Sequence, residues 1–281
     1  MITPLPPHPA ALLKSHGTRL MAIADLHIGW EMSLSAQGIH VPPQTPKLLK
    51  RLMALLSEYK PDEILVLGDV KHTIATAEKM EWRDVPDFFD ALRKRVSRIS
   101  IIRGNHDGNL EPLLPEGTRI LPATGEAFDD VGFFHGHRWP SPALLKCGTL
   151  VMGHVHPVVV FRDPAGFRVM RQVWMKARCD GIRLSEVLLR KHKIKVEGNA
   201  EDTFRAHYGM KPKASQLFIM PSFNDYLGGR PLNERRPSGS SMARMTSGPV
   251  LRSEAVDMRN AEAYLLDGTL LGTVEQLRTL S

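Results

Sequence analysis

The 281-residue chain has few cysteines and no long apolar run, and each absence excludes a class of protein. Its two cysteines, Cys147 and Cys179, are too few for a disulfide scaffold and do not form a metal-binding pair. No stretch reaches the roughly 20 apolar residues that a membrane helix needs. The N-terminus also lacks the charged and then apolar segments of a signal peptide, so we expect a cytoplasmic protein without membrane spans.

The composition is that of a globular protein with a basic surface. Hydrophobic residues make up 42% of the chain, and the formal net charge is +7. We predict one domain over residues 1–281, with a flexible loop at 228–249, where Gly, Pro, Ser and Arg occur without periodicity. The positive charge favours anionic partners such as nucleic acid or phosphorylated molecules, although many basic proteins bind nothing acidic.

Short apolar runs alternate with helical patterns in the first half of the chain. Five runs have the length and composition of strands buried on both faces: 19–27, 62–70, 98–107, 131–137 and 148–156. Apolar residues recur at helical spacing in 45–60 and 83–96. We expect Thr45 to be the N-cap of the first helix, followed by Pro46 as its first residue, and Asp84 to be the N-cap of the second helix. Strands alternating with helices indicate an α/β fold.

The second half is richer in strands. Residues 166–178 alternate, with Phe167, Val169, Val173 and Met175 on one side, which predicts a half-buried strand. We expect a short helix at 183–191, another strand at 216–223, and a hairpin turning at Asp267-Gly268.

Residues that can bind metals or transfer protons follow the end of every one of the five apolar runs. They are Asp25 and His27; Asp69 and His72; Asn105, His106 and Asp107; His135 and His137; and His154 and His156. The carboxyl ends of strands in an open α/β sheet converge on one crevice. A lone histidine there would more often be a hydrogen-bonded polar group than a ligand, but five coincident strand ends favour one functional site.

Many histidines and aspartates crowded together need a counter-charge. Without a cation they would leave buried polar groups unpaired, at a cost of roughly several kcal/mol. Imidazole, carboxylate and amide ligands without thiolates suit Mn²⁺, Fe or Zn²⁺. There are too many candidate ligands for one ion, and two ions that share a carboxylate would use them.

Five motifs in this order resemble the signature of the calcineurin-like metallophosphoesterases: DLH at 25–27, GDVKH at 68–72, GNHD at 104–107, HGH at 135–137 and GHVH at 153–156. ADLHIGWE, MPSFNDYLGG and DGTLLG look closer still to the archaeal-type SbcD-related phosphoesterases, which are similar also to the ligase-associated bacterial ones. The resemblance implies a four-layer α/β/β/α sandwich of two mixed sheets, with one metal cleft at the strand ends.

The resemblance also implies roles for the residues at the strand ends. The first metal would be held by Asp25, His27 and His156, the second by Asn105, His135 and His154, and Asp69 would bridge them. The two divalent ions are expected to be Mn²⁺, with Fe, Zn²⁺ or Mg²⁺ as alternatives. His106 would contact the phosphate and the leaving oxygen, with His72 behind it, and His137 would support a ligand or face the substrate. Asp107 would either take part in the site or only cap the following turn.

The expected reaction is hydrolysis of a phosphodiester by a hydroxide that bridges the metals, on nucleic acid or nucleotides. A phosphatase or small-molecule phosphodiesterase of the same fold is the alternative. A non-catalytic metal-binding scaffold is least expected, because His106 and all seven metal positions are present. The basic segment 168–195 is either a nucleic-acid surface or the solvated face of a strand and helix. The oligomeric state stays open.

Overall fold

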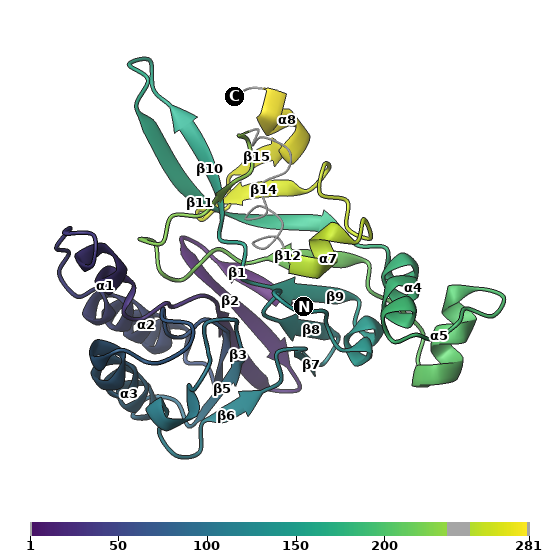
Figure 1. The fold of residues 1–281 in the computed structure, drawn as a ribbon, viewed down its shortest axis with the longest axis horizontal. Coiled ribbons are helices and arrows are strands. Elements are labelled where there is room, and N and C mark those ends of the chain that lie inside the picture. Colours follow the sequence, from purple (N-terminus) through teal and green to yellow (C-terminus); the bar gives the residue numbers. More distant parts are fainter. Residues whose placement is uncertain (1, 235–247, 280–281) are drawn as a thin grey trace.

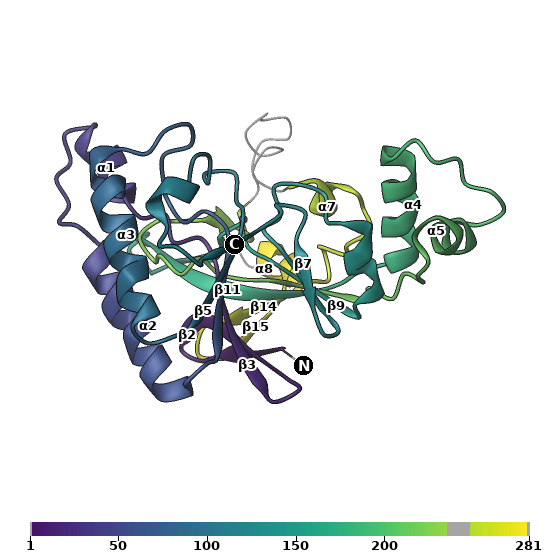
Figure 2. The same cartoon turned by 90° about the horizontal axis from the view of Figure 1, so that it is seen from below.

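The computed structural model describes residues 2–234 and 248–279. Two β-sheets lie face to face in the middle of the molecule, and helices cover the outer side of each (Figures 1 and 2). The predicted four-layer α/β/β/α sandwich of two mixed sheets is therefore confirmed. Within the described ranges, none of the helices is long and apolar enough to cross a membrane.

The first sheet has six strands in chain order, and from β3 onward neighbouring strands are parallel. Its strands are β1 (Ile2–Leu5), β2 (His8–Ser15), β3 (Thr18–Ile23), β4 (Glu63–Leu67), β5 (Arg98–Ile102) and β6 (Arg119–Leu121). Its outer face is covered by α1 (Trp30–Ser35), α2 (Thr45–Tyr59) and α3 (Lys79–Arg93), which connect the parallel strands (Figure 1). The 3₁₀ helix η1 (Glu111–Leu113) precedes β6. The sheet-to-helix crossovers place the ends of β3, β4 and β5 at the same edge.

The second sheet has the order β13-β10-β11-β12-β9-β8-β7, with β14 on β11 and β15 on β14. The strands are β7 (Glu126–Phe128), β8 (Val131–Phe134), β9 (Thr149–Met152), β10 (Pro157–Arg162), β11 (Arg168–Arg178), β12 (Gln216–Ile219), β13 (Arg230–Pro231), β14 (Glu262–Leu265) and β15 (Leu270–Thr273). The helices of this half are η2 (Pro142–Lys146), α4 (Gly181–Lys191), α5 (Ala200–Tyr208), α7 (Gly248–Arg252) and α8 (Val274–Thr279).

Three apolar clusters hold the layers together, and β4 contributes to two of them. Its residues alternate between the two faces of the sheet. Ile64 and Val66 pack toward α2 and α3, whereas Leu65 and Leu67 face the second sheet. There they meet Phe133, and all these side chains are buried. A third cluster lies between the second sheet and α4 and α5. The uninterrupted apolar runs seen in the sequence are thus explained by burial on both faces.

The helix starts differ from the sequence predictions. Gln44 caps α2 and Thr45 is already helical, so the predicted cap is one residue too late. The second helix begins at Lys79 rather than near Asp84, because Glu78 and Glu81 form a reciprocal capping box. Asp84 lies buried inside the helix and accepts a hydrogen bond from the Thr45 hydroxyl at 3.3 Å.

The strand predicted over 166–178 is present as β11, but its predicted buried face is buried only in its second half. Val173 and Met175 are fully buried, as expected, but Phe167 is 71% exposed and Val169 is 37% exposed. The hairpin formed by β10 and β11 extends beyond the rest of the second sheet, so its outer part has no layer to pack against (Figure 1). β10 itself was not predicted. The hairpin at Asp267-Gly268 is confirmed, with Gly268 at φ +94°.

The remaining elements of the second half begin or end at other residues than expected. α4 starts at Gly181, because the carboxylate of Asp180 accepts the backbone N–H of Arg183 at 2.9 Å. β12 ends at Ile219, before the polar residues that follow it. The predicted loop at 228–249 carries β13 and the start of α7 at its two ends; its middle, 235–247, lies outside the described residues.

Candidate metal centre

The predicted site residues lie at five strand ends, three in the first sheet and two in the second. The backbone there is irregular: Asp25, His27, Asp69, His154 and His156 all have positive φ, between 44° and 69°. A non-glycine residue with this backbone conformation lowers the stability of the fold by on the order of 1–3 kcal/mol, so the conformation occurs only where contacts with the surrounding structure hold it in place. Hydrogen bonds between strand ends do so here: the backbone N–H of His27 donates to the carbonyl of Asp69 at 2.8 Å.

Two glycines allow the strand ends to approach each other. A Cβ on Gly68, which has φ +75°, would lie 2.5 Å from Nδ1 of His135. A Cβ on Gly104 would lie 2.2 Å from Oδ1 of Asp69. No side chain fits at either position, so the glycines of the GDVKH and GNHD motifs are needed for the strand ends to meet.

Asp69 lies between histidines from two different strand ends. Its Oδ2 is 3.4 Å from Nε2 of His27 and 3.4 Å from Nε2 of His135. Its other oxygen accepts the backbone N–H of His106 at 2.9 Å. The carboxylate is buried, so its position and orientation are fixed by these neighbours. One carboxylate therefore faces two groups of ligand atoms.

The first group is Asp25, His27 and His156, whose ligand atoms lie within 4.8 Å of one another. Nε2 of His156 is 3.4 Å from Oδ1 of Asp25. Nε2 of His27 and Nε2 of His156 are shielded from solvent and make no hydrogen bond. The set matches the residues that the resemblance assigned to the first metal.

The second group is Asp69, His135 and His154, again with ligand atoms within 4.8 Å. Oδ1 of Asn105 lies 3.1 Å from Nε2 of His135, and Nε2 of His154 makes no hydrogen bond. Nδ1 of His135 lies 2.7 Å from the carbonyl of Leu67, which fixes Nδ1 as the protonated nitrogen and turns Nε2 toward Asp69.

The donor set fits two divalent cations. Buried polar atoms are nearly always hydrogen-bonded, yet Nε2 of His27, of His154 and of His156 has no hydrogen-bond partner, and Nε2 of His27 and of His156 each lie 3.4 Å from a carboxylate oxygen. A cation in each group would satisfy those nitrogens and the charges of Asp25 and Asp69 together. The site could thus supply ligands to two ions, with Asp69 between the two groups.

The electrostatics favour the ligand forms of most of these groups. Burial lowers the pKa of His154 to about 4, with a contribution from His135, so His154 is neutral near pH 7. Burial disfavours a charge on Asp69, but the imidazoles of His135 and His27 hold its pKa well below the usual value. Burial likewise opposes a charge on His135, but the charge of Asp69 raises its pKa to about 10. A cation at this place would replace the proton on His135.

His106 and His72 lie beside the first group. The His106 ring is 4.7 Å from that of His27, and its Nδ1 hydrogen-bonds to the backbone carbonyl of His72. Nδ1 of the His72 ring is 3.2 Å from Nδ1 of His27, and burial lowers the pKa of His72 to about 4. His72 thus holds His106 through its backbone, while its ring contacts a predicted ligand.

His137 lies beside the second group. Its ring centroid is 5.1 Å from that of His135, and its Nδ1 makes no hydrogen bond. Burial, reinforced by His135, lowers the pKa of His137 to about 3, so its ring is neutral.

Asp107 does not cap the following turn, so that alternative of the sequence analysis is wrong. Its fully buried carboxylate accepts three backbone N–H groups, from Gly104 at 2.7 Å and from Asp69 and Val70 at 2.8 Å each. It therefore joins the end of β4 to the end of β5. Burial and the nearby charge of Asp69 raise the pKa of Asp107 to about 6.

Sequence reasoning missed two further residues that hold the site. The Ser222 hydroxyl donates to the carbonyl of Asp25 at 2.9 Å, and Nδ2 of Asn224 donates to the carbonyl of Leu26 at 3.0 Å. Both side chains are buried. Both residues belong to the MPSFNDYLGG segment that follows β12, but nothing in the sequence placed them next to the first motif.

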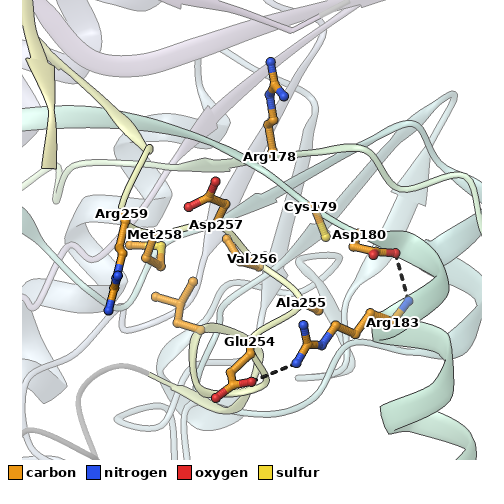
Figure 3. A pocket seen from close by; sticks show the side chains of 11 residues that line it. Arg178, Cys179, Asp180, Arg183, Glu254, Ala255, Val256, Asp257, Met258 and Arg259 are labelled. Carbon is orange, nitrogen blue, oxygen red and sulfur yellow. Dashed lines mark hydrogen bonds and ion pairs between the residues drawn. The ribbon is translucent and has the colours of Figure 1, made fainter. Parts of the chain in front are cut away.

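A separate cavity of about 590 Å³ lies near α4 and α7 and contains none of the predicted site residues (Figure 3). Two of its charged side chains, Arg183 and Glu254, pair with each other at 2.8 Å. Burial and the charge of Asp180 raise the pKa of the Cys179 thiol to about 12, so Cys179 is not a nucleophile.

The similarities of the chain to known proteins concern its family and its fold. The family model "Calcineurin-like phosphoesterase" matches residues 18–154. The chain is similar to the Pseudomonas putida nuclease MPE, with 18% identity and a TM-score of 0.51 over 93% of this chain and 100% of that one. It is also similar to YfcE, a phosphoesterase from E. coli, with 21% identity and a TM-score of 0.32 over 51% of this chain and 73% of that one. The first likeness shows a shared fold. No curated protein matches the chain.

Proposed function

This chain belongs to the calcineurin-like phosphoesterase family and is a metal-dependent phosphoesterase, and we propose that it hydrolyses phosphodiester bonds in nucleic acids or nucleotides with two metal ions. The observation that carries the proposal is the position of Asp69, whose Oδ2 lies 3.4 Å from a histidine of each ligand group. A carboxylate that faces two groups of ligands is the arrangement that a two-metal site requires.

In the proposed site Asp69 is shared by both ions. The other ligands are Asp25, His27 and His156 for the first ion and Asn105, His135 and His154 for the second. Two divalent ions, Mn²⁺ before Fe, Zn²⁺ or Mg²⁺, would supply an activated water and neutralise charge on the phosphate. The mixture of oxygen and imidazole donors, without a thiolate among the proposed ligands, fits this range of ions.

His106 is proposed to act on the substrate. Its Nδ1 is engaged by the His72 carbonyl, which leaves Nε2 as the atom that can reach a phosphate or a leaving oxygen. A protonated Nε2 would donate its proton to the departing oxygen, and the same charge would stabilise the transition state. The neutral ring of His137 beside the second group is proposed to contact the substrate.

The choice of nucleic acid or nucleotides rests on charge and on one similar protein. The net charge is +7, and the similar Pseudomonas putida protein is described as a nuclease. The basic segment 168–195 supports the choice only weakly, because several of its arginines are already paired: Arg168 with Glu234 at 2.7 Å and Arg190 with Glu186 at 2.9 Å. The proposal includes nuclease activity like that of the SbcD-related phosphoesterases. It also includes a location in the reducing cytoplasm, which the two free and buried cysteines support.

The test is a substrate panel with purified protein and Mn²⁺. It contains bis-p-nitrophenyl phosphate, p-nitrophenyl phosphate, cyclic nucleotides, and single- and double-stranded DNA. We expect the diesters and at least one nucleic-acid substrate to be cleaved, and a chelator to abolish the activity. The matched control is His207→Ala, which changes an exposed histidine on α5 and should retain full activity where His106→Ala does not. Cleavage of the monoester alone would identify a phosphatase instead.

A further inference from the structure

An aromatic pair and a lysine lie beside the metal centre and have no part in the proposed chemistry. The rings of Trp30 and Tyr226 are 5.9 Å apart and tilted by 30°. Nζ of Lys47 lies 5.2 Å from the centre of the Tyr226 ring and 3.1 Å from its hydroxyl. Tyr226 is 41% exposed, so part of its side chain is open to solvent.

Trp30 is joined directly to the first ligand group. Its backbone N–H donates to the carbonyl of His27 at 3.1 Å, at the point where the chain turns into α1. Gly29 makes this turn possible with φ +88°. The indole is therefore placed by the same strand end that carries Asp25 and His27.

Tyr226 is joined to that strand end from the other half of the chain. Its backbone N–H donates to Oδ1 of Asn224 at 3.1 Å, and Nδ2 of Asn224 donates to the carbonyl of Leu26. Arg51 on α2 donates to the carbonyl of Phe223 at 3.2 Å and pairs with Asp225 at 3.4 Å. Figure 1 shows this loop after β12 reaching across to α1 and α2.

The loop then continues to the other strand end of the first ligand group. The backbone N–H of Arg230 donates to the carbonyl of His156 at 2.9 Å. A Cβ on Gly229 would lie 2.1 Å from that same oxygen, so the loop passes directly over His156. Residues 222–230 thus run between the strand end of Asp25 and the strand end of His156, with Tyr226 on the way.

We propose that Trp30, Tyr226 and Lys47 form a subsite that stacks an unpaired nucleobase of the substrate next to the cleaved phosphate. Exposed aromatic rings on a rigid support bind bases of any identity through their faces, and a lysine beside them pairs with the phosphate backbone. A base inside a duplex is already stacked on its neighbours, so the subsite selects single-stranded nucleic acid or nucleotides. The inference rests on the proposed phosphodiesterase function and names its substrate class.

The test compares two diesters that share a leaving group. Thymidine 5′-(p-nitrophenyl phosphate) carries a base, and ethyl p-nitrophenyl phosphate does not. With Mn²⁺ present, the wild-type protein should have a KM for the thymidine ester on the order of 10- to 100-fold below that for the ethyl ester, the range expected from stacking one base. Tyr226→Ala should remove most of that difference and leave kcat for both esters within about two-fold.

Two variants serve as controls. Tyr226→Phe keeps the ring and loses only the hydroxyl, so it should keep the preference for the thymidine ester. Phe167→Ala removes another exposed aromatic side chain, at the outer end of the β10–β11 hairpin, and should change neither KM. Thermal unfolding of each variant checks that the fold is retained.

The outcomes separate the subsite from the function. If the wild-type protein cleaves both esters with equal KM, or if Tyr226→Ala weakens both equally, the subsite is refuted and the phosphodiesterase activity stands. If neither ester is cleaved with any of the four metals, the proposed function itself fails. A preference of the wild-type protein for duplex over single-stranded DNA would also overturn the subsite.

Discussion

Replacing Asp107 should destabilise the protein and loosen the metal centre, because this carboxylate joins two strand ends without binding a metal. It is fully buried and accepts backbone N–H groups from Gly104, Asp69 and Val70. Asp107→Ala would leave three buried donors without an acceptor, at roughly 1–3 kcal/mol each. Removing a buried charge recovers part of this cost, so we expect a net loss of about 2–4 kcal/mol in the free energy of unfolding.

Asp107→Asn should have an intermediate effect that the geometry predicts in detail. Oδ2 serves Gly104 and Asp69, and Oδ1 serves Val70. An amide oxygen in the place of Oδ2 keeps two of the three bonds, while the NH₂ group faces the N–H of Val70. One donor is lost, so the loss should be about 1–2 kcal/mol.

The assay is urea unfolding of chelator-treated protein, followed by measurement of bound metal in the untreated variants. Asp267→Ala is the matched control, since that aspartate also accepts a backbone N–H, from Thr269 at 2.9 Å, but is exposed in a hairpin turn. Its urea midpoint should hardly move. A loss below about 1 kcal/mol for Asp107→Ala would refute the reasoning that the three bonds hold the strand ends together.

Three further predictions concern the centre itself. Asp69→Ala should remove more metal than any single histidine variant, because it faces both ligand groups; full occupancy by elemental analysis would exclude a shared carboxylate. The His106→Ala variant should keep its metal content and have a kcat lower by about 10²–10⁴-fold. The loss in kcat should be smaller on nitrophenyl esters than on nucleotides, because the leaving oxygen of a nucleotide needs a proton. Loss of metal from this variant would show that His106 is a metal ligand. In chelated protein His72 and His154 have pKa values of about 4, below the ordinary 6.5. Between pH 6.5 and 4 the unfolded chain therefore binds more protons than the folded one, so the free energy of unfolding should fall as the pH drops. A free energy of unfolding that stays constant in urea titrations over this range would contradict those pKa values.

The parts of the fold that were predictable are those set by local pattern. Continuous apolar runs gave the central strands, and β4 is buried at every position, as such a run requires. Boundaries were less accurate where a side chain decides them from outside the pattern. The capping box of Glu78 and Glu81 starts α3 well before Asp84, and Glu78 at the N-cap position is not a residue that usually caps a helix.

Exposure at the β10–β11 hairpin could not be predicted, because the alternation of apolar and polar residues says which side chains share a face and not whether anything covers that face. Phe167 and Met175 belong to the same pattern, yet one is 71% exposed and the other fully buried. Contacts between segments far apart in the sequence could not be predicted either. Ser222 and Asn224 support the strand end of Asp25 through contacts between residues 197 and 198 positions apart in the chain.

The centre is completed only when the two sheets are packed together. Asp25, His27, Asp69 and Asn105 come from the first sheet, whereas His135, His154 and His156 come from the second. Neither sheet alone has a full ligand set, and the apolar layer between them holds the two sets within reach of each other. An ion held by both sets, as proposed, would bind the packed protein and not the separated sheets. Metal binding would then stabilise the contact between the sheets, and a change in the apolar layer should lower metal affinity without touching a proposed ligand.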